Sequence, residues 1–115
     1  MKMNAVVAGV GMTHFGKHLE TGLKALGAQA VQAAVADAGI TLADLQAAYV
    51  GNAAAGLLTG QESIRGQVIL RGMGVGKIPV INVENACASA STAFHEACAM
   101  VSAGAYDIVL ALGVE

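Results

Sequence analysis

Charged and aromatic side chains are scarce in this 115-residue sequence. Only 12% of the residues are charged, against about a quarter in a typical soluble domain. The Lys and Arg residues are dispersed and form no basic tract, which excludes the electrostatic footprint of a nucleic-acid-binding protein. Aromatic residues make up 3%, so the core has to be built from Ala, Val, Leu, Ile and Met. This composition indicates that much of the surface is buried against another body, or that the chain is part of a larger one.

Cysteine and long apolar runs are also rare. The two cysteines, Cys87 and Cys98, do not make a disulfide framework. If one helix carries both, they lie about 16 Å apart along its axis, whereas a disulfide needs Cα atoms within about 7 Å. Two free thiols favour a reducing, cytoplasmic location. No apolar run approaches the roughly 18 residues needed to span a bilayer, so no membrane span is predicted.

Two glycine-rich segments resemble nucleotide-binding loops only superficially. The pattern Gly9-x-Gly11-x-x-His14 lacks the third glycine of a dinucleotide fingerprint, and no helix is predicted directly after it. The segment 72–77 lacks the first glycine of a P-loop, because Arg71 stands at that position. Ile78-Pro79 follows its lysine, where a P-loop has Ser or Thr and then a helix. We therefore predict a turn at 72–77 and no nucleotide site in either segment.

The hydrophobic pattern alternates between short apolar runs and segments of helical period. The runs predict strands at 5–10, 47–51, 80–83 and 108–114, and the periodic segments predict helices at 22–38, 62–71 and 86–103. The resulting β-α-β-α-β-α-β order predicts an α/β fold, with a mostly parallel sheet and helices on both faces. Residues 1–115 form at most one domain. Because the sequence stops directly after an apolar strand, we expect a fragment of a longer protein.

Cys87 is the candidate for chemistry, because it lies where a strand turns into a helix. Asn85 is a suitable N-cap, which would place Cys87 two residues into the helix. The unpaired N–H groups and partial positive charge of a helix start favour a thiolate. A cysteine in Ala-rich surroundings can equally be a small buried hydrophobe. Position alone leaves both interpretations open.

A family resemblance favours the reactive interpretation. Asn85-Ala86-Cys87-Ala88-Ser89-Ala90-Ser91, preceded by Ile81-Asn82-Val83-Glu84, resembles the nucleophile region of thiolases. It is most similar to the branch of sterol carrier protein X and the bacterial lipid-transfer thiolases. The segments 6–16 and 107–115 resemble the opening of that branch and the strand after its nucleophile helix. The resemblance covers nearly the whole chain and implies an incomplete N-terminal half-domain of the thiolase fold.

The resemblance implies that Cys87 forms a thioester with an acyl- or 3-oxoacyl-CoA, in thiolysis or Claisen condensation. The alternative is a lipid-transfer or aldolase-type relative that binds acyl- or steroid-CoA without a covalent thioester. A small Rossmann-like binding module with an inert Cys87 is the third interpretation. Coenzyme A thioesters would be substrates, with no metal and no permanently bound cofactor. The family usually has glycine where this chain has Ala90, so the extra methyl group is expected to crowd the helix against a neighbour.

The acid/base residues of thiolases have no counterpart in this sequence. The family uses a histidine in a Gly-His-Pro segment, and often a second cysteine in a Cys-x-Gly segment. The histidines here, His14, His18 and His95, do not follow glycine, and Ala99 follows Cys98. If one helix carried both Cys87 and His95, they would be separated by about 12 Å of helical rise. We therefore expect this chain alone to be inactive.

The resemblance also implies a partner chain. In the family's dimers the strand before the nucleophile pairs with its copy, which points here to Val80–Val83. We expect a homodimer, or a larger complex with another thiolase-family or accessory chain. Leu57 and Leu58, in a loop predicted at 53–60, are expected to contact another surface as well.

Overall fold

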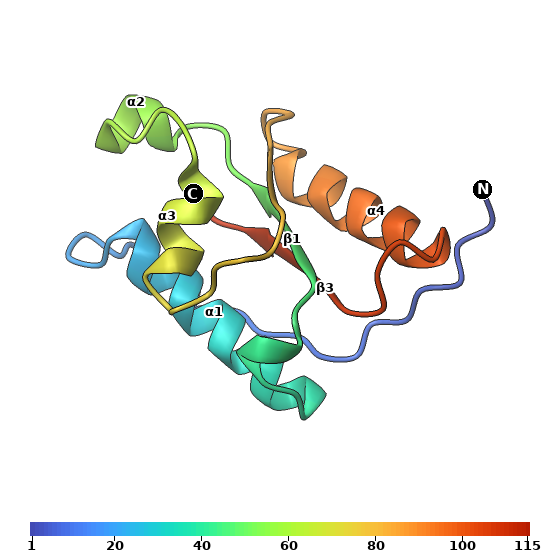
Figure 1. Cartoon of the computed structure of the whole chain (residues 1–115). Coiled ribbons are helices and arrows are strands. Elements are labelled where there is room, and N and C mark those ends of the chain that lie inside the picture. Colours follow the sequence, from blue (N-terminus) through green and yellow to red (C-terminus); the bar gives the residue numbers. More distant parts are fainter.

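A three-stranded parallel sheet forms the centre of the computed structural model, which describes all residues from 1 to 115 (Figure 1). Its strands are β1 (Ala47–Gly51), β2 (Val80–Val83) and β3 (Val109–Gly113), in the spatial order β2–β1–β3. The register pairs Tyr49 of β1 with Ile81 on one side and Ala111 on the other. The predicted strands at 47–51, 80–83 and 108–114 are therefore confirmed, the last one shorter by a residue at each end.

Helices cover both faces of this sheet, as predicted. The helical elements of the chain are α1 (Leu23–Ala38), the 3-10 turn η1 (Leu42–Asp44), α2 (Ala55–Thr59), α3 (Arg65–Arg71) and α4 (Ser89–Ser102), of which α1, α3 and α4 pack on the sheet. In Figure 1, α4 lies on one side of the strands, and α1 and α3 lie on the other. The α/β class with a parallel sheet is confirmed.

The alternation of side chains along β1 divides the core between the two faces. Ala48 and Val50 join a cluster with Val31 of α1 and with Ile69 and Leu70 of α3. Tyr49 points to the other face, where a smaller cluster includes Ala93 and Ala97 of α4. Every residue of β1 is buried. The central strand is thus covered on both faces, and its carboxyl end is held in one position.

The predicted strand at 5–10 is wrong. Residues 1–13 are extended but pair with no strand, and Val6 is 86% exposed. The segment follows α1 because its glycines let the two backbones touch. A β-carbon at Gly9 would lie 2.5 Å from the carbonyl oxygen of Ala34, and the N–H of Val10 donates to Asp37 at 2.8 Å. The β-α-β-α-β-α-β order therefore loses its first strand, and β3 pairs directly with β1.

Several local boundaries also differ from the prediction. The helix α1 begins at Leu23, one residue later than predicted, and its N-cap Gly22 makes no side-chain hydrogen bond. The helix predicted from residue 62 begins only at Arg65, because Ile64 has a left-handed backbone with φ of 47°. The predicted loop at 53–60 contains the short helix α2. The predicted end of α1 at residue 38 is confirmed, and Gly39 follows it as a left-handed C-cap with φ of 69°.

Candidate functional site

The turn between β2 and α4 presents Cys87 through a strained residue. Ala86 has φ of 47°, in the left-handed region that costs a residue with a β-carbon about 1–2 kcal/mol. The Ala86 N–H donates to the carboxylate of Glu84 at 2.8 Å. Cys87 follows directly and is exposed. Strain of this kind persists only where the surrounding contacts over-determine the turn.

The buried hydroxyl of Ser89 supplies two of those contacts. Ser89 is 4% exposed, and its Oγ accepts the N–H of Asn85 and donates to the carbonyl of Ala86, each at 2.8 Å. The side chain of Asn85 donates to Thr92 Oγ1 at 3.0 Å, one turn further along α4. These bonds join the residues before and after Cys87 into one rigid loop. Ser89 was not predicted as a site residue, and only its place two residues after the cysteine could have suggested it.

Cys87 does not lie inside the helix, which corrects the predicted cap. The helix α4 begins at Ser89, and its N-cap is Ala88 rather than Asn85. The left-handed Ala86 delays the helix start, because the chain reverses there before it can continue as a helix. The N–H of Cys87 makes no hydrogen bond within the chain. Cys87 therefore lies one residue before the cap, with its own N–H available beside its thiol.

Two glycines form the support beneath this turn. Gly51 ends β1, Gly113 ends β3, and the two are partners in the parallel register. A β-carbon at Gly51 would lie 2.6 Å from the carbonyl carbon and oxygen of Ser89. A β-carbon at Gly113 would overlap the methyl group of Ala90. The first turn of α4 thus rests directly on the carboxyl ends of two strands, where parallel α/β sheets generally bind their ligands.

A small cavity of about 260 Å³ opens beside Cys87. It is lined by Gly51, Ala86, Cys87, Ser89, Ala90, Gly113, Val114 and Glu115. Cys87, the candidate for chemistry from the sequence, is therefore one of the residues that line this cavity. Neither Gly51 nor Gly113 was predicted as a site residue, because the contacts that require glycine join segments far apart in the sequence.

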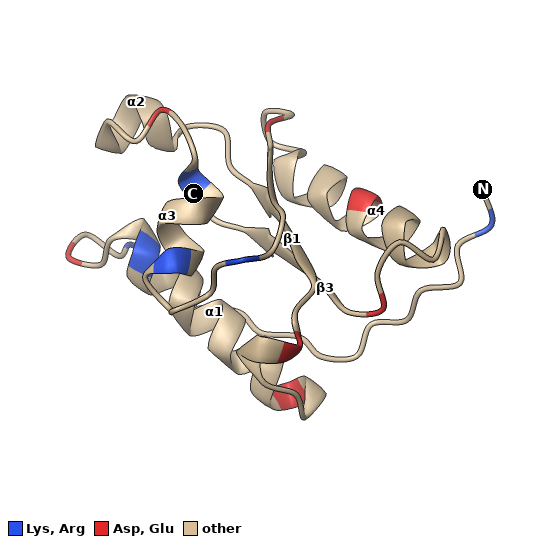
Figure 2. Cartoon of the chain, in the orientation of Figure 1, with Lys and Arg blue, Asp and Glu red and all other residues tan.

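The carboxylates of the turn and the cavity are bonded to backbone N–H groups. Besides the bond from Ala86 to Glu84, the Glu115 carboxylate accepts the N–H groups of Ala53 and Ala54 before α2. Charged residues are sparse over the whole chain (Figure 2), and α4 carries only Glu96. The carboxylates of Glu84 and Glu115 are thus the charged groups at the turn and the cavity.

The other candidate residues lie away from this cavity. Cys98 is half-buried on α4, and both it and Cys87 are free cysteines. His95 is exposed and lies 3.5 Å from Glu96, and His18 hydrogen-bonds the carbonyl of His14. No histidine lines the small cavity. The cavity beside Cys87 is therefore lined by no basic side chain of this chain.

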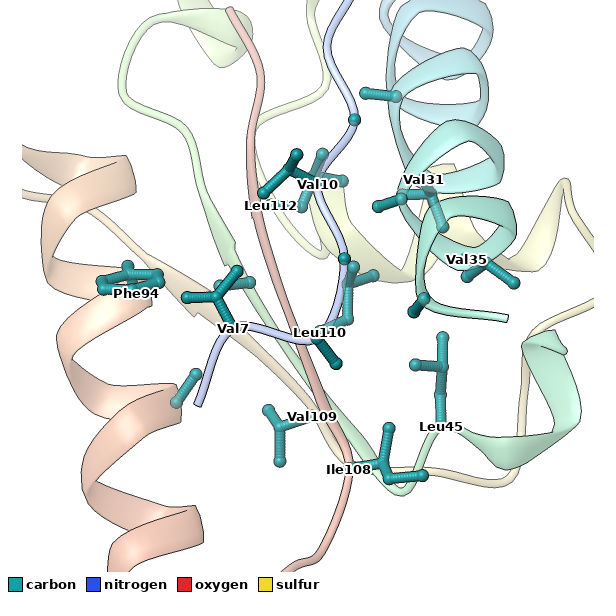
Figure 3. Close-up of a pocket in the computed structure, with 18 of the residues that line it drawn as sticks. Val7, Val10, Val31, Val35, Leu45, Phe94, Ile108, Val109, Leu110 and Leu112 are labelled. Atoms are coloured by element: carbon teal, nitrogen blue, oxygen red, sulfur yellow. The ribbon is translucent and has the colours of Figure 1, made fainter. Parts of the chain in front are cut away.

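A second, larger cavity of about 610 Å³ lies between the N-terminal segment, α1, α4 and β3. Most of the residues that line it are apolar, and Cys87 is not among them. Figure 3 shows Val7 and Val10 of the N-terminal segment between Phe94 of α4 and the valines of α1. The floor carries Leu110 and Leu112 of β3. This space suits an apolar group and has no nucleophile except the half-buried Cys98.

One titratable group has a shifted pKa. Burial beneath α4 raises the pKa of Tyr49 above its usual 10.0, with smaller contributions from Tyr106 and Glu96. Tyr49 therefore stays neutral at physiological pH as part of the core. No group of three His, Cys, Asp or Glu side chains is arranged to hold a metal ion, and no helix has the length and hydrophobicity of a membrane span.

Comparisons with known protein families and sequences agree with one another. Residues 5–115 match the thiolase N-terminal domain. An acetyl-CoA acetyltransferase of Methanocaldococcus jannaschii is 42% identical over 112 residues, which cover 97% of this chain and 28% of that protein. Sterol carrier protein 2 of Gallus gallus is 40% identical, with 100% of this chain and 20% of that protein covered.

Two further proteins are similar to this chain, one in sequence and one in fold. The benzoylsuccinyl-CoA thiolase subunit BbsB of Thauera aromatica is 36% identical over 100% of this chain and 29% of its own length. The crystal structure of 3-oxoacyl-[acyl-carrier-protein] synthase III from Aquifex aeolicus has a similar fold, with a TM-score of 0.64 and 16% identity. It covers 76% of this chain and 27% of the synthase chain. The chain thus spans less than a third of the length of each of these proteins.

The Ser89 hydroxyl is predicted to stabilise the turn that holds Cys87. Ser89→Ala leaves the Asn85 N–H without its acceptor, so we expect a loss of about 1–3 kcal/mol in the free energy of unfolding, measured by urea denaturation. The matched control is Ser91→Ala, because Ser91 is exposed. This control should change the free energy by less than about 0.5 kcal/mol. Equal effects of the two substitutions would show that the Ser89 bonds do not hold the turn.

The two cysteines should differ in reactivity. A short pulse of iodoacetamide on the native protein should alkylate Cys87 faster than Cys98, because Cys87 is exposed at a turn and Cys98 is half-buried within a helix. Peptide mass spectrometry measures the two alkylation rates, and the urea-unfolded chain gives the reference rate of each cysteine in the absence of folded structure. Equal native rates, or faster labelling of Cys98, would contradict this assignment.

Proposed function

Because the chain belongs to the thiolase N-terminal domain family, we propose that it is the nucleophile-bearing part of an acyltransferase in which Cys87 forms a thioester with an acyl- or 3-oxoacyl-CoA. The observation that carries the proposal is the exposed Cys87 on a strained turn above the carboxyl ends of β1 and β3, facing a small cavity. Two of the similar proteins are named acetyl-CoA acetyltransferase and thiolase subunit, which supports the reaction class.

The chemistry begins with attack of the Cys87 thiolate on the carbonyl carbon of the substrate. With a 3-oxoacyl-CoA, a bond forms between Sγ and the 3-carbonyl carbon, and the bond between carbons 2 and 3 breaks. The released enolate of acetyl-CoA takes up a proton. The thiolate of a second coenzyme A then attacks the thioester, forms the shortened acyl-CoA and regenerates the Cys87 thiolate. Thiolate is both a strong nucleophile and a good leaving group, so each half-reaction is reversible.

The free N–H of Cys87 is suited to stabilise the oxyanion of this reaction. It makes no hydrogen bond within the chain and is held beside the thiol by the bonds of Ser89 and Glu84. A fixed backbone donor needs little reorganisation as negative charge develops on the carbonyl oxygen. The loss of one such donor typically lowers the rate by about 100- to 1000-fold.

The base that activates Cys87 is proposed to come from outside these 115 residues. None of the three histidines lines the cavity beside Cys87. The chain spans less than a third of each of the relatives described above. Coenzyme A thioesters are proposed as substrates, with no permanently bound cofactor, and the two free thiols favour a cytoplasmic location.

The larger cavity favours a second candidate function, in which a thiolase-like lipid-transfer or aldolase-type protein binds acyl- or steroid-CoA without a thioester. The cavity of about 610 Å³ has an apolar lining and falls within the usual range of small-molecule pockets, about 300–1,000 Å³. A similar protein is named sterol carrier protein 2. In this function, binding of the lipid would not depend on Cys87.

Acyl transfer to Cys87 distinguishes the two functions. The full-length protein, incubated with acetoacetyl-CoA and quenched in acid, should carry an acetyl group on Cys87, located by peptide mass spectrometry. Cys87→Ser should lose both this adduct and thiolysis. Thiolysis that persists in Cys87→Ser would contradict the thioester, and acyl-CoA binding without any adduct or turnover would favour the second function. The 115-residue chain alone should show no turnover, because no histidine faces Cys87.

A homodimer, or a larger complex with another thiolase-family or accessory chain, is proposed as the working assembly. The strand β2 is at the edge of the sheet and pairs only with β1, so the unpaired backbone groups on its outer side can bind a second copy. Leu57 and Leu58 are 90% and 74% exposed and offer further apolar contact. We expect sedimentation equilibrium at micromolar concentration to give a mass above the 11.4 kDa monomer. A monomer whose melting temperature is independent of concentration would contradict this prediction.

A further inference from the structure

Ala90 lines the small cavity beside Cys87. Ala90 follows Cys87 by three residues, and both line the cavity together with Gly113 of β3. A β-carbon at Gly113 would overlap the Ala90 methyl group and would lie 3.5 Å from its Cα. Gly113 is thus the neighbour of the Ala90 methyl group, and its lack of a β-carbon leaves room for this group. Ala90 is still exposed to the cavity side, so its methyl group contacts β3 and also faces the space where an acyl group on Cys87 would lie.

We infer that Ala90 determines specificity, because its methyl group limits the length of the acyl group that Cys87 accepts. This inference rests on the proposed acyl transfer to Cys87 and adds the substrate class, short-chain acyl-CoA. The cavity volume of about 260 Å³ is below the usual lower limit for small-molecule pockets, about 300 Å³. One methyl group therefore occupies a significant part of the space.

The other lining residues leave less freedom to change the cavity. At Gly51 the space above the strand is already filled by the backbone of Ser89, 2.6 Å from where a β-carbon would be. The Ser89 hydroxyl is held by its two hydrogen bonds, and the Glu115 carboxylate by the N–H groups of Ala53 and Ala54. Ala90 carries no such bond, and its β-carbon can be removed without breaking a polar contact. The size of the cavity can therefore be changed at Ala90 without the loss of a polar contact.

The test compares acetyl-CoA with butyryl-CoA as acyl donors to the full-length protein. In Ala90→Gly, the ratio of kcat/KM for butyryl-CoA to that for acetyl-CoA should rise about tenfold or more, since one methylene in an apolar pocket is typically worth 10- to 200-fold. The matched control is Ala99→Gly, which makes the same substitution in α4 away from both cavities. This control should leave the ratio unchanged and shows the effect of glycine on the helix alone.

A compensating variant separates pocket size from helix stability. In Ala90→Gly combined with Gly113→Ala, the methyl group is moved from the helix to the strand, where only the Cα of residue 90 lies near it, at 3.5 Å. The preference for acetyl-CoA should return in this double variant. If Ala90→Gly still acylates Cys87 but keeps the original ratio, the inference is overturned while the proposed function stands. If neither donor acylates Cys87 in the unchanged protein, the proposed function itself fails.

Discussion

The contact between the first turn of α4 and two adjacent strand ends is the constraint on which the site depends. Gly51 and Gly113 are neighbours in the parallel register, and neither has a β-carbon to hold the helix away. The backbone of Ser89 therefore comes close enough that a β-carbon at Gly51 would be 2.6 Å from it. A larger residue at either position would lift the helix start and move Cys87 with it. The position of the Cys87 thiol thus depends on the absence of a β-carbon at Gly51 and at Gly113.

The strain at Ala86 is understandable once this contact is present. Because the start of α4 is held close to the strand ends, the chain has to reverse sharply between β2 and the helix. Ala86 takes the left-handed conformation at this reversal. The Ser89 hydroxyl and the Glu84 carboxylate bond the backbone on both sides of the reversal. The same reversal leaves the N–H of Cys87 free, so the geometry that exposes the thiol also provides a donor beside it. The packing of α4 on the sheet therefore also determines the geometry of the turn around Cys87.

The parts of this arrangement that depend on local patterns could be predicted from the sequence. Strands β1, β2 and β3 follow from short apolar runs, α1 ends at residue 38 as predicted, and Cys87 was singled out from its place between a strand and a helix. The strand predicted at 5–10 was wrong because Gly9 favours close contact with α1, a tertiary effect that a valine-rich run does not reveal. The cap at Asn85 was wrong because a left-handed alanine has no sequence signal. Gly51, Gly113 and Ser89 were missed because their roles arise only when distant segments meet.

The central claim is that this turn presents Cys87 as an acyl acceptor with its own N–H as the oxyanion donor. The most direct measurement is a crystal structure of the full-length protein after brief exposure to acetyl-CoA. The account predicts an acetyl group bonded to Sγ of Cys87, with its oxygen within hydrogen-bond distance of the Cys87 N–H, and the first turn of α4 resting on Gly51 and Gly113. An acetyl group on another residue would contradict the account. So would intact acetyl-CoA bound in the larger cavity while Cys87 stays unmodified.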